Sequence, residues 1–138
     1  RADVEPATAL GDQGLLERLA GNLVENGLRH NVEGGWVTVS TAADSSWVTL
    51  EVANSGRLLN PDTVAGLVEP FRREGSDRTA AIGFGLGLSI VDAIVGAHGG
   101  TLRLSARPDG GLLVTARLPA APQEAREGAE RPPAPARV

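Results

Sequence analysis

The sequence has 138 residues, the length of one ordinary domain, and we expect one fold with one principal site. It contains no cysteine and only two histidines, which excludes disulfides, thiolate nucleophiles and histidine-rich metal clusters but leaves open a magnesium site with oxygen ligands. The net charge of -4 disfavours a nucleic-acid partner, and because all 13 basic residues are arginine, P-loop and Schiff-base lysines are excluded.

The ends of the chain and its apolar segments indicate whether it belongs to a longer protein and whether it could span a membrane. The chain opens with Arg1 and has no basic apolar leader, so we expect an excised or mature piece of a longer protein. The longest apolar run, 86–97, is too short and too interrupted to span a bilayer. Prolines and alanines are frequent in the last twenty residues. We therefore expect a soluble, monomeric fragment, folded over residues 1–118, with a disordered tail over 119–138.

The first half of the chain predicts a helix followed by a hairpin. Asp12 suits an N-cap, and apolar residues recur at helical spacing from there to about His30. Residues 36–42 and 47–53 each alternate between apolar and polar side chains, with a turn around Asp44 between them. Each of these two strands is expected to bury one face.

The middle of the chain predicts a long loop and a short helix. Periodicity fades from residue 55 to residue 82, and loops of that length in a domain are usually functional. Within it, Asn60 as N-cap and Pro61 at the first position predict a helix over 61–68.

The last third predicts a second firm helix and a second hairpin. Apolar spacing indicates a helix over 88–97, ended by His98-Gly99-Gly100. Alternating runs at 101–106 and 112–118 flank a glycine-rich turn. Together the elements predict an α+β two-layer sandwich, with a mixed, mainly antiparallel sheet and helices on one face.

A glycine-rich segment stands at the entry to the second firm helix. It reads Gly83-Phe84-Gly85-Leu86-Gly87-Leu88-Ser89. A helix N-terminus offers unpaired N–H groups, and glycines let the backbone approach an anion, so phosphate is the natural ligand. The spacing matches neither the dinucleotide fingerprint nor a Walker loop, and tight helix-on-sheet packing is the alternative explanation of these glycines.

Polar residues also follow one edge of the first helix. Asn22, Asn26 and Arg29 are spaced i, i+4 and i+7, which places them within about 60° of one another. Asparagines inside a helix are poor helix formers, so a site would explain them, and a solvated helix edge is the alternative. An asparagine oxygen suits Mg²⁺ bound jointly with substrate phosphates.

Four segments follow one another in a recognisable order. They are Asn22 to Asn31, Val52 to Gly56, Glu69 to Arg73 and Gly83 to Ser89. They look like the N, G1, F and G2 boxes of the ATP-binding catalytic domain of bacterial sensor histidine kinases, a branch of the group that includes gyrase, Hsp90 and MutL. The resemblance covers nearly all of residues 7–118. The stretch from Leu88 to Leu102 favours the histidine-kinase branch over the anti-sigma serine kinases.

The resemblance implies roles for the residues of the first helix. Asn26 matches the asparagine that coordinates Mg²⁺, and Asn22, Arg29 and His30 match neighbours that face the phosphates and the nucleotide. Asn22 also stands where the ATPase relatives keep a glutamate that activates water. We therefore expect feeble hydrolysis, which suits a kinase that saves its γ-phosphate for a histidine.

The resemblance implies further ATP contacts in the other boxes. The phosphate-side loop is matched by Gly83, Gly85 and Gly87 with the amides of Leu86 and Leu88. The base-binding segment is matched by Asn54 and Gly56.

Residues 57–82 match the mobile ATP lid of the family. In it Phe71 is expected to pack as a hinge, and Arg72 or Arg73 to approach the γ-phosphate. Which arginine does so is left open.

The sequence departs from the family pattern around the base. Asn54 replaces the aspartate that accepts the adenine amino hydrogen, and Leu58 replaces a glycine. An amide oxygen can still accept from the amine, so we expect adenine binding to persist but to be up to about tenfold weaker than with aspartate. His30 replaces a common tyrosine, so stacking on the base is expected to be weaker and pH-sensitive.

Other residues that invite a chemical role are assigned structural ones. Neither histidine suits a phosphoacceptor, and His98 is expected to end its helix. Glu25 and Glu69 are as well explained by a solvated or lid-surface position as by a general base. Trp36 and Trp47 are expected to pack on the sheet.

The resemblance implies that the chain is the catalytic domain of a protein histidine kinase. It would bind Mg²⁺ and ATP and donate the γ-phosphate to a histidine on the kinase's own dimerisation domain, with a response regulator downstream and no nucleic acid. The chain would be the cytoplasmic domain of a membrane-bound sensor. The alternatives are a regulatory interaction module of the same fold that binds ATP weakly, and an anti-sigma serine kinase.

Overall fold

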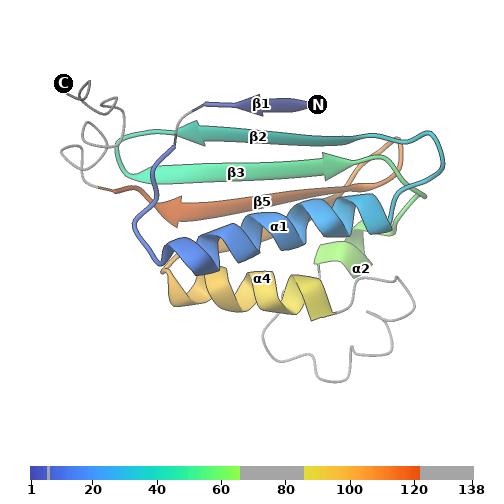
Figure 1. Ribbon diagram of the computed structural model, residues 1–138. Helices are drawn as coiled ribbons and strands as arrows, with labels where there is room; N and C mark the ends of the chain where they lie inside the picture. The colour runs from blue at the N-terminus through green and yellow to red at the C-terminus, as the bar shows by residue number, and fades with distance from the viewer. Residues whose placement is uncertain (6, 66–85, 122–138) are drawn as a thin grey trace, which may run out of the picture.

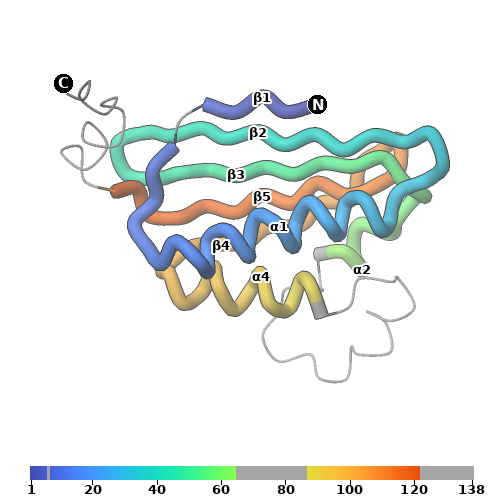
Figure 2. Tube along the Cα trace, in the orientation of Figure 1, coloured from blue at the N-terminus to red at the C-terminus, as the bar shows by residue number. Residues whose placement is uncertain are grey.

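The structure, a computed structural model, describes residues 1–5, 7–65 and 86–121. In chain order its elements are β1 (Ala2–Val4), α1 (Gln13–Arg29), β2 (Val37–Ala43), β3 (Trp47–Asn54), α2 (Pro61–Ala65), α4 (Leu86–Ala97), β4 (Thr101–Ala106) and β5 (Leu112–Pro119). The strands form a five-stranded sheet in the order β1-β2-β3-β5-β4. Figure 2 shows β1 at one edge of this sheet and labels β4, which forms the other edge.

The sheet is mixed and mainly antiparallel, as predicted. Strand β1 pairs with β2 in parallel, whereas the pairs β2 with β3, β3 with β5 and β4 with β5 are antiparallel. The two predicted hairpins, β2 with β3 and β4 with β5, are both confirmed. In the first, the Asp44 carboxylate caps the turn by accepting from the backbone N–H groups of Ser46 and Trp47, both at 2.8 Å.

Helices α1 and α4 lie side by side and antiparallel across one face of the sheet (Figure 1). The buried side chains of α1, α2 and α4 and of the strands beneath them form the hydrophobic core. They are Leu19, Leu23, Val52, Val64, Leu88, Val91, Ile94, Val95, Leu104, Leu112, Val114, Ala116 and Leu118. The alternate strand residues, such as Ser40, Glu51 and Thr115, are paired in register on the other face. The predicted two-layer sandwich with helices on one face is therefore confirmed.

The helix ends follow the predicted signals. The Asp12 carboxylate accepts from the N–H of Leu15 at 2.9 Å, as an N-cap does, and Asn60 accepts from the N–H of Asp62 at 2.9 Å. At the end of α4, Gly99 has a φ of +70°, and Gly100 donates to the carbonyl of Val95 at 2.9 Å. This six-to-one bond, with glycine in the left-handed region, is the Schellman type of helix stop.

The structure differs from the sequence expectations in three places. Strand β1 was not predicted, because three exposed residues carry no alternation that a sequence can show. Helix α4 begins at Leu86 rather than at residue 88. Pro119 closes β5, Ala120 pairs with Ala9, and Ala121 donates to the carbonyl of Thr8 at 2.9 Å, so these residues, which we had assigned to the tail, are part of the fold. Residues 122–138, and 66–68 of the predicted short helix, lie outside the described residues.

Within the part of the chain that the structure describes, no helix combines the length and the apolarity that a membrane crossing demands.

Candidate functional site

Four elements meet at one end of the molecule. Figure 1 shows the last turn of α1, the end of β3, helix α2 and the first turn of α4 at the same end of the sandwich. Of the predicted site residues, Asn26 and Arg29 lie in the last turn of α1, Asn54 ends β3, and Gly87 and Leu88 lie in the first turn of α4. Asn22 lies about two turns before the end of α1. The antiparallel packing of α1 on α4 is what brings them together, because the end of one helix then lies next to the start of the other.

The polar edge of α1 divides into a buried part and an exposed part. Asn26 is 9% exposed, and Asn22 is half-buried. The side-chain nitrogen of Asn22 is buried and has no hydrogen-bond partner, the one such atom among the described residues. A buried amide donor without a partner costs free energy, so it marks a place where a ligand with acceptor oxygens would be stabilised.

Arg29 does not share this buried edge. Its guanidinium pairs with the carboxylate of Glu25 at 2.7 Å, one helical turn earlier, and both side chains are largely exposed. Such a surface pair contributes little to stability and can separate readily. Asn22 and Asn26 thus lie on one edge of α1, whereas Arg29 turns towards Glu25. The exposed ion pair supports a surface position for Glu25.

The end of β3 packs directly against α1. A Cβ atom placed on Gly27 would lie 3.6 Å from the Cβ of Asn54 and 3.4 Å from a methyl group of Val37, which are ordinary packing distances. This face of α1 therefore lies close against the strand end. Asn54 is 3% exposed, and its amide nitrogen donates to the carbonyl of Ser55 at 2.8 Å. This bond uses the nitrogen as donor and leaves the amide oxygen as the atom that can accept from a ligand.

His30 and Gly56 lie close together beside Asn54. A Cβ on Gly56 would lie 3.1 Å from the carbonyl oxygen of His30, which allows little room for any side chain there. Burial lowers the pKa of His30 below its ordinary value of 6.5, and the positive charges of Arg29 and Arg57 lower it further. The imidazole at this position is therefore neutral at pH 7.

The first turn of α4 has one side that points away from the other described residues. A Cβ on Gly87 would meet no described atom within 4 Å, whereas Leu88 is 6% exposed and belongs to the core. Helix α4 begins at Leu86, so its first amides lie in this region. The other predicted residues of the phosphate loop and lid, Gly83, Gly85, Phe71, Arg72 and Arg73, lie outside the described residues.

Sequence reasoning missed a cluster of hydrogen bonds behind Asn54. Ser55 donates its hydroxyl to the Asn31 side-chain oxygen at 2.5 Å and accepts from the N–H of Trp36 at 2.7 Å. The amide nitrogen of Asn31 donates to the carbonyl of Trp36 at 2.8 Å. These bonds tie the loop after α1 to the segment after β3. Only the polar nature of Asn31 and Ser55 could have indicated these bonds, because the two residues are 24 positions apart in the sequence.

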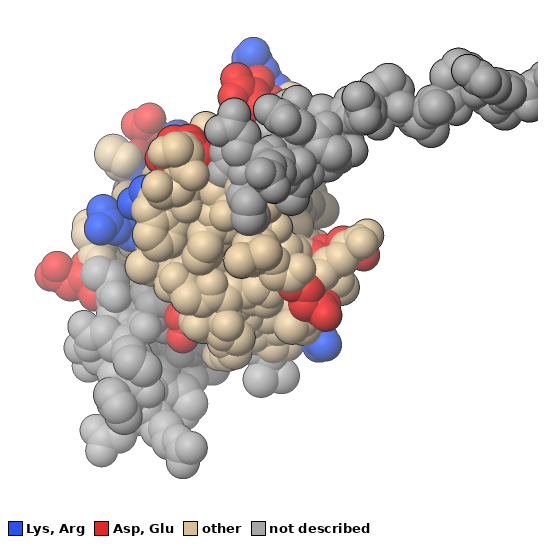
Figure 3. Space-filling model, turned by 90° about the vertical axis from the view of Figure 1, so that its left-hand side faces the viewer, with Lys and Arg blue, Asp and Glu red and all other residues tan. Residues whose placement is uncertain are grey.

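The charges of the described residues do not suggest other kinds of site. On the face shown in Figure 3, basic and acidic side chains are scattered, and the described atoms show no continuous basic patch there. No group of three or more histidine, cysteine, aspartate or glutamate side chains that would hold a metal occurs among the described residues. A divalent cation at this end would therefore rely on amide oxygens together with oxygens of a bound phosphate.

Residues 11–122 match the family model described as histidine kinase-, DNA gyrase B-, and HSP90-like ATPase. The sensor protein CutS of Streptomyces coelicolor is 44% identical over 121 residues, which are 86% of this chain and 29% of that protein. The chain thus spans less than a third of the length of this relative.

Solved structures show the same likeness. The mycobacterial sensor histidine kinase MprB superposes with a TM-score of 0.71 at 28% identity, covering 89% of this chain and 84% of that one. Full-length ShkA superposes with a TM-score of 0.66 at 26% identity, covering 88% of this chain and 26% of that one. The chain therefore belongs to the histidine kinase-, DNA gyrase B- and HSP90-like ATPase family, and within it to the catalytic ATP-binding domains of the sensor histidine kinases.

Proposed function

We propose that this chain binds Mg²⁺ and ATP at the end where α1, β3 and α4 meet, and presents the γ-phosphate to a histidine of the parent kinase's dimerisation domain. The observation that carries the proposal is the buried, unpartnered amide nitrogen of Asn22 beside buried Asn26 on α1. The relatives support it, and the structure of ShkA was solved in complex with AMPPNP, a close analogue of ATP.

The base is assigned to the end of β3. The oxygen of Asn54, whose nitrogen is held by Ser55, accepts from an exocyclic amine, and Gly27 and Gly56 lie beside Asn54. Neutral His30 offers an aromatic face next to this position. These contacts would place the base between α1 and the segment 54–57.

The phosphates are assigned to the edge of α1 and the start of α4. The amide nitrogen of Asn22 donates to a phosphate oxygen, and the backbone N–H groups of Gly87 and Leu88, with those of Gly83 and Gly85 before them, donate to the others. Arg29 would reach the phosphates by leaving its surface pair with Glu25. Phe71 would act as the hinge of the lid and Arg72 or Arg73 as the partner of the γ-phosphate.

The residues present fit a magnesium ion. Asn26 supplies a buried side-chain amide oxygen on the same helix edge as the donor of Asn22, which leaves the phosphate oxygens to complete an oxygen shell. A bound Mg²⁺ would neutralise charge that develops on the β- and γ-phosphates during transfer. Asn26 is the residue that would hold it.

The chain's own contribution to catalysis is positioning. Asn22 has no proton-accepting carboxylate with which to activate water, so it holds a phosphate oxygen without promoting hydrolysis. The first turn of α4 adds fixed amide dipoles near the transferring group. The attacking nucleophile, a histidine, would come from the parent kinase's dimerisation domain, and a response regulator would accept the phosphoryl group afterwards.

The remaining assignments concern the parent protein. We propose that it is a membrane-bound sensor with this domain in the cytoplasm, that the catalytic domain extends over residues 1–121, and that the proline-rich remainder of the chain serves as a tail. The fragment alone is expected to be monomeric and to bind no nucleic acid.

The decisive experiment is a titration of the 138-residue chain with a fluorescent ATP analogue, with and without Mg²⁺. Saturable binding that strengthens with Mg²⁺ is expected for the wild-type chain, and Asn26→Ala is expected to abolish the Mg²⁺ effect. Gly21→Ala, on the exposed side of the same helix, is the matched control and should bind as the wild type does. Binding that ignores Mg²⁺ in every variant would contradict the proposal.

One observation favours a second candidate function, a regulatory module that binds ATP weakly and acts through protein contacts. Asn54 and Leu58 stand where the family carries aspartate and glycine, and Leu58 is 76% exposed. An exposed leucine beside the base position suits a protein contact as well as a lid. Failure of the wild-type chain to bind the analogue at millimolar concentration, with the fold intact, would favour this function.

A further inference from the structure

The turn between β4 and β5, residues 107–111, is packed against the segment Asn54 to Arg57. Gly111 donates its N–H to the carbonyl of Arg57 at 2.9 Å. Gly110 and Gly111 have φ angles of +102° and +88°, and a Cβ on either would overlap the backbone of Gly56 or Asn54. The turn therefore forms a backbone wall directly behind the residues assigned to the base.

Arg107 holds this turn in shape and joins it to Trp36, the residue that precedes β2. Its guanidinium donates to the carbonyl of Gly110 at 3.0 Å, and its backbone N–H donates to the carbonyl of Gly111 at 3.0 Å. The guanidinium carbon also lies 4.5 Å from the centroid of the Trp36 ring. A cation over an indole face at this distance is attracted by the ring quadrupole.

Trp36 is joined to the same segment from the opposite side. Its N–H donates to the hydroxyl of Ser55 at 2.7 Å, and its carbonyl accepts from the N–H of Ser55 at 3.0 Å. The contacts thus close a ring that runs from Ser55 to Trp36, on to Arg107, through the glycine turn and back to Arg57. Gly56 is held between Ser55 and Arg57, the two fixed ends of this segment, and Asn54 immediately precedes it.

We propose that Arg107 is a positioning residue for the nucleotide site. It acts through the backbone of residues 54–57, and it sets how well Asn54 and Gly56 fit the base. The inference rests on the proposed function, because it assumes that the base binds at Asn54. Since this ring of contacts adjoins the base end and not α4, Arg107 is expected to affect ATP and ADP equally.

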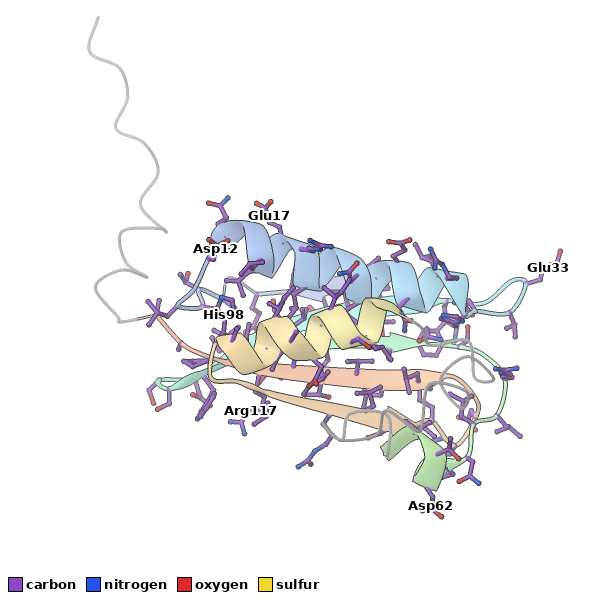
Figure 4. The ribbon with its side chains drawn as sticks, turned by 90° about the horizontal axis from the view of Figure 1, so that it is seen from below. Asp12, Glu17, Glu33, Asp62, His98 and Arg117 are labelled. Atoms are coloured by element: carbon purple, nitrogen blue, oxygen red, sulfur yellow. The ribbon has the colours of Figure 1, made fainter. Side chains whose placement is uncertain are left out.

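The chain supplies a matched control for this residue. Arg117 lies over the ring of Trp47, with the guanidinium carbon 5.1 Å from the centroid, so the chemistry of the pair is the same. Trp47 begins β3 and Asn54 ends it, which places the second pair at the far end of the sheet. Figure 4 shows Arg117 at the end where His98 lies, away from α2.

The experiment compares Arg107→Ala, Arg107→Lys and Arg117→Ala in the 138-residue chain. The dissociation constants of ATP and ADP are measured by displacement of a fluorescent analogue, and thermal unfolding is followed without nucleotide. Arg107→Ala is expected to raise both dissociation constants about fivefold, and Arg107→Lys to recover at least half of that loss because a cation remains over the indole. Arg117→Ala is expected to lower the unfolding temperature while changing neither constant by more than about twofold.

Each result of this experiment either supports or overturns the positioning role of Arg107. Unchanged dissociation constants in Arg107→Ala would overturn it, as would an equal loss in Arg117→Ala, which would indicate a general effect of lower stability. A loss confined to ATP would overturn the assignment to the base end. If Arg107→Ala does not fold, Arg107→Gln replaces it, with about a threefold increase expected and wild-type affinity overturning the inference. A wild-type chain that binds neither nucleotide would refute the proposed function itself, and this inference with it.

Discussion

The backbone N–H of Asp12 donates to Nε2 of His98 at 3.2 Å, and Nδ1 of the same ring lies 2.7 Å from the carbonyl oxygen of Ile94. Because Nε2 accepts a hydrogen bond, the proton of the neutral ring is on Nδ1, which donates to Ile94. Figure 4 shows Asp12 and His98 at the same end of the two helices. His98 thus ends α4, as predicted, and also ties it to the N-cap of α1.

His98→Ala is expected to lower the free energy of unfolding by about 1 to 2 kcal/mol, because two hydrogen bonds are lost and the Asp12 amide must find water. A Cβ on Gly11 would overlap the His98 ring, so Gly11→Ala is expected to destabilise the wild-type chain. In the His98→Ala background the same change should cost much less. Urea unfolding of the two single variants and the double variant measures this coupling, and strictly additive losses would contradict the contact.

Asn22→Leu is expected to change stability and affinity in opposite directions. It removes a buried donor that has no partner and inserts a better helix former, so the nucleotide-free chain should gain about 1 kcal/mol or more. The same change removes a phosphate donor, so affinity for ATP should fall at least about tenfold. Thermal unfolding and analogue titration measure the two effects.

Gly21→Ala is the control for that pair of measurements. It lies one residue away on the exposed side of α1, where a Cβ would meet no atom within 4 Å. It should raise stability by about 1 kcal/mol through helix propensity alone and leave affinity unchanged. If Asn22→Leu behaved in the same way as this control, Asn22 would have no role in binding.

Asn54→Asp tests whether the amide weakens recognition of the base. The carboxylate restores a charge-assisted acceptor for the adenine amine, so ATP should bind up to about tenfold more tightly. It also loses the donor to the Ser55 carbonyl, now 2.8 Å away, so the nucleotide-free chain should be less stable. Titration of this variant measures the gain in ATP affinity, and thermal unfolding measures the loss of stability. An affinity no better than that of the wild type would contradict the prediction.

His30 should make stability depend on pH. Its pKa is lowered in the folded state by burial and by Arg29 and Arg57, so the unfolded chain binds its proton more readily. The stability that neutral His30 provides is therefore complete above its ordinary value of 6.5 and is lost as the pH falls through the lower folded-state pKa. Unfolding curves between pH 5 and pH 8 should show a steeper loss for the wild type than for His30→Gln. Parallel curves would refute this assignment.

Much of the fold follows from local signals. Asp12 and Gly99 mark helix ends because caps and stops depend on a few adjacent residues, and the turn at Asp44 likewise needs only its own carboxylate. Strand β1 could not be predicted, because no local signal marks it. Its pairing with residues 39–41 of β2 is a parallel contact between segments far apart in the chain, and its side chains are exposed.

The residues of the candidate site likewise divide into those that local sequence signals indicate and those that depend on contacts between distant segments. Asn22, Asn26 and Asn54 were predicted because helix spacing and family motifs single them out. The contacts of Arg107 were not predicted, because nothing near it in the sequence indicates that it meets Trp36, which lies 71 residues earlier, just before β2. Arg29 was predicted to face the phosphates, but Glu25 stands four residues before it, a helical spacing that itself favours the ion pair that the structure shows.

The helices that the structure describes lie on one face of the sheet, and the chain has no cysteine, so the opposite face offers positions for a single chemical label. Ser105 is exposed on β4, two residues before Arg107. A fluorophore attached at Ser105→Cys would therefore report on the glycine turn as nucleotide binds, while the core beneath it stays untouched.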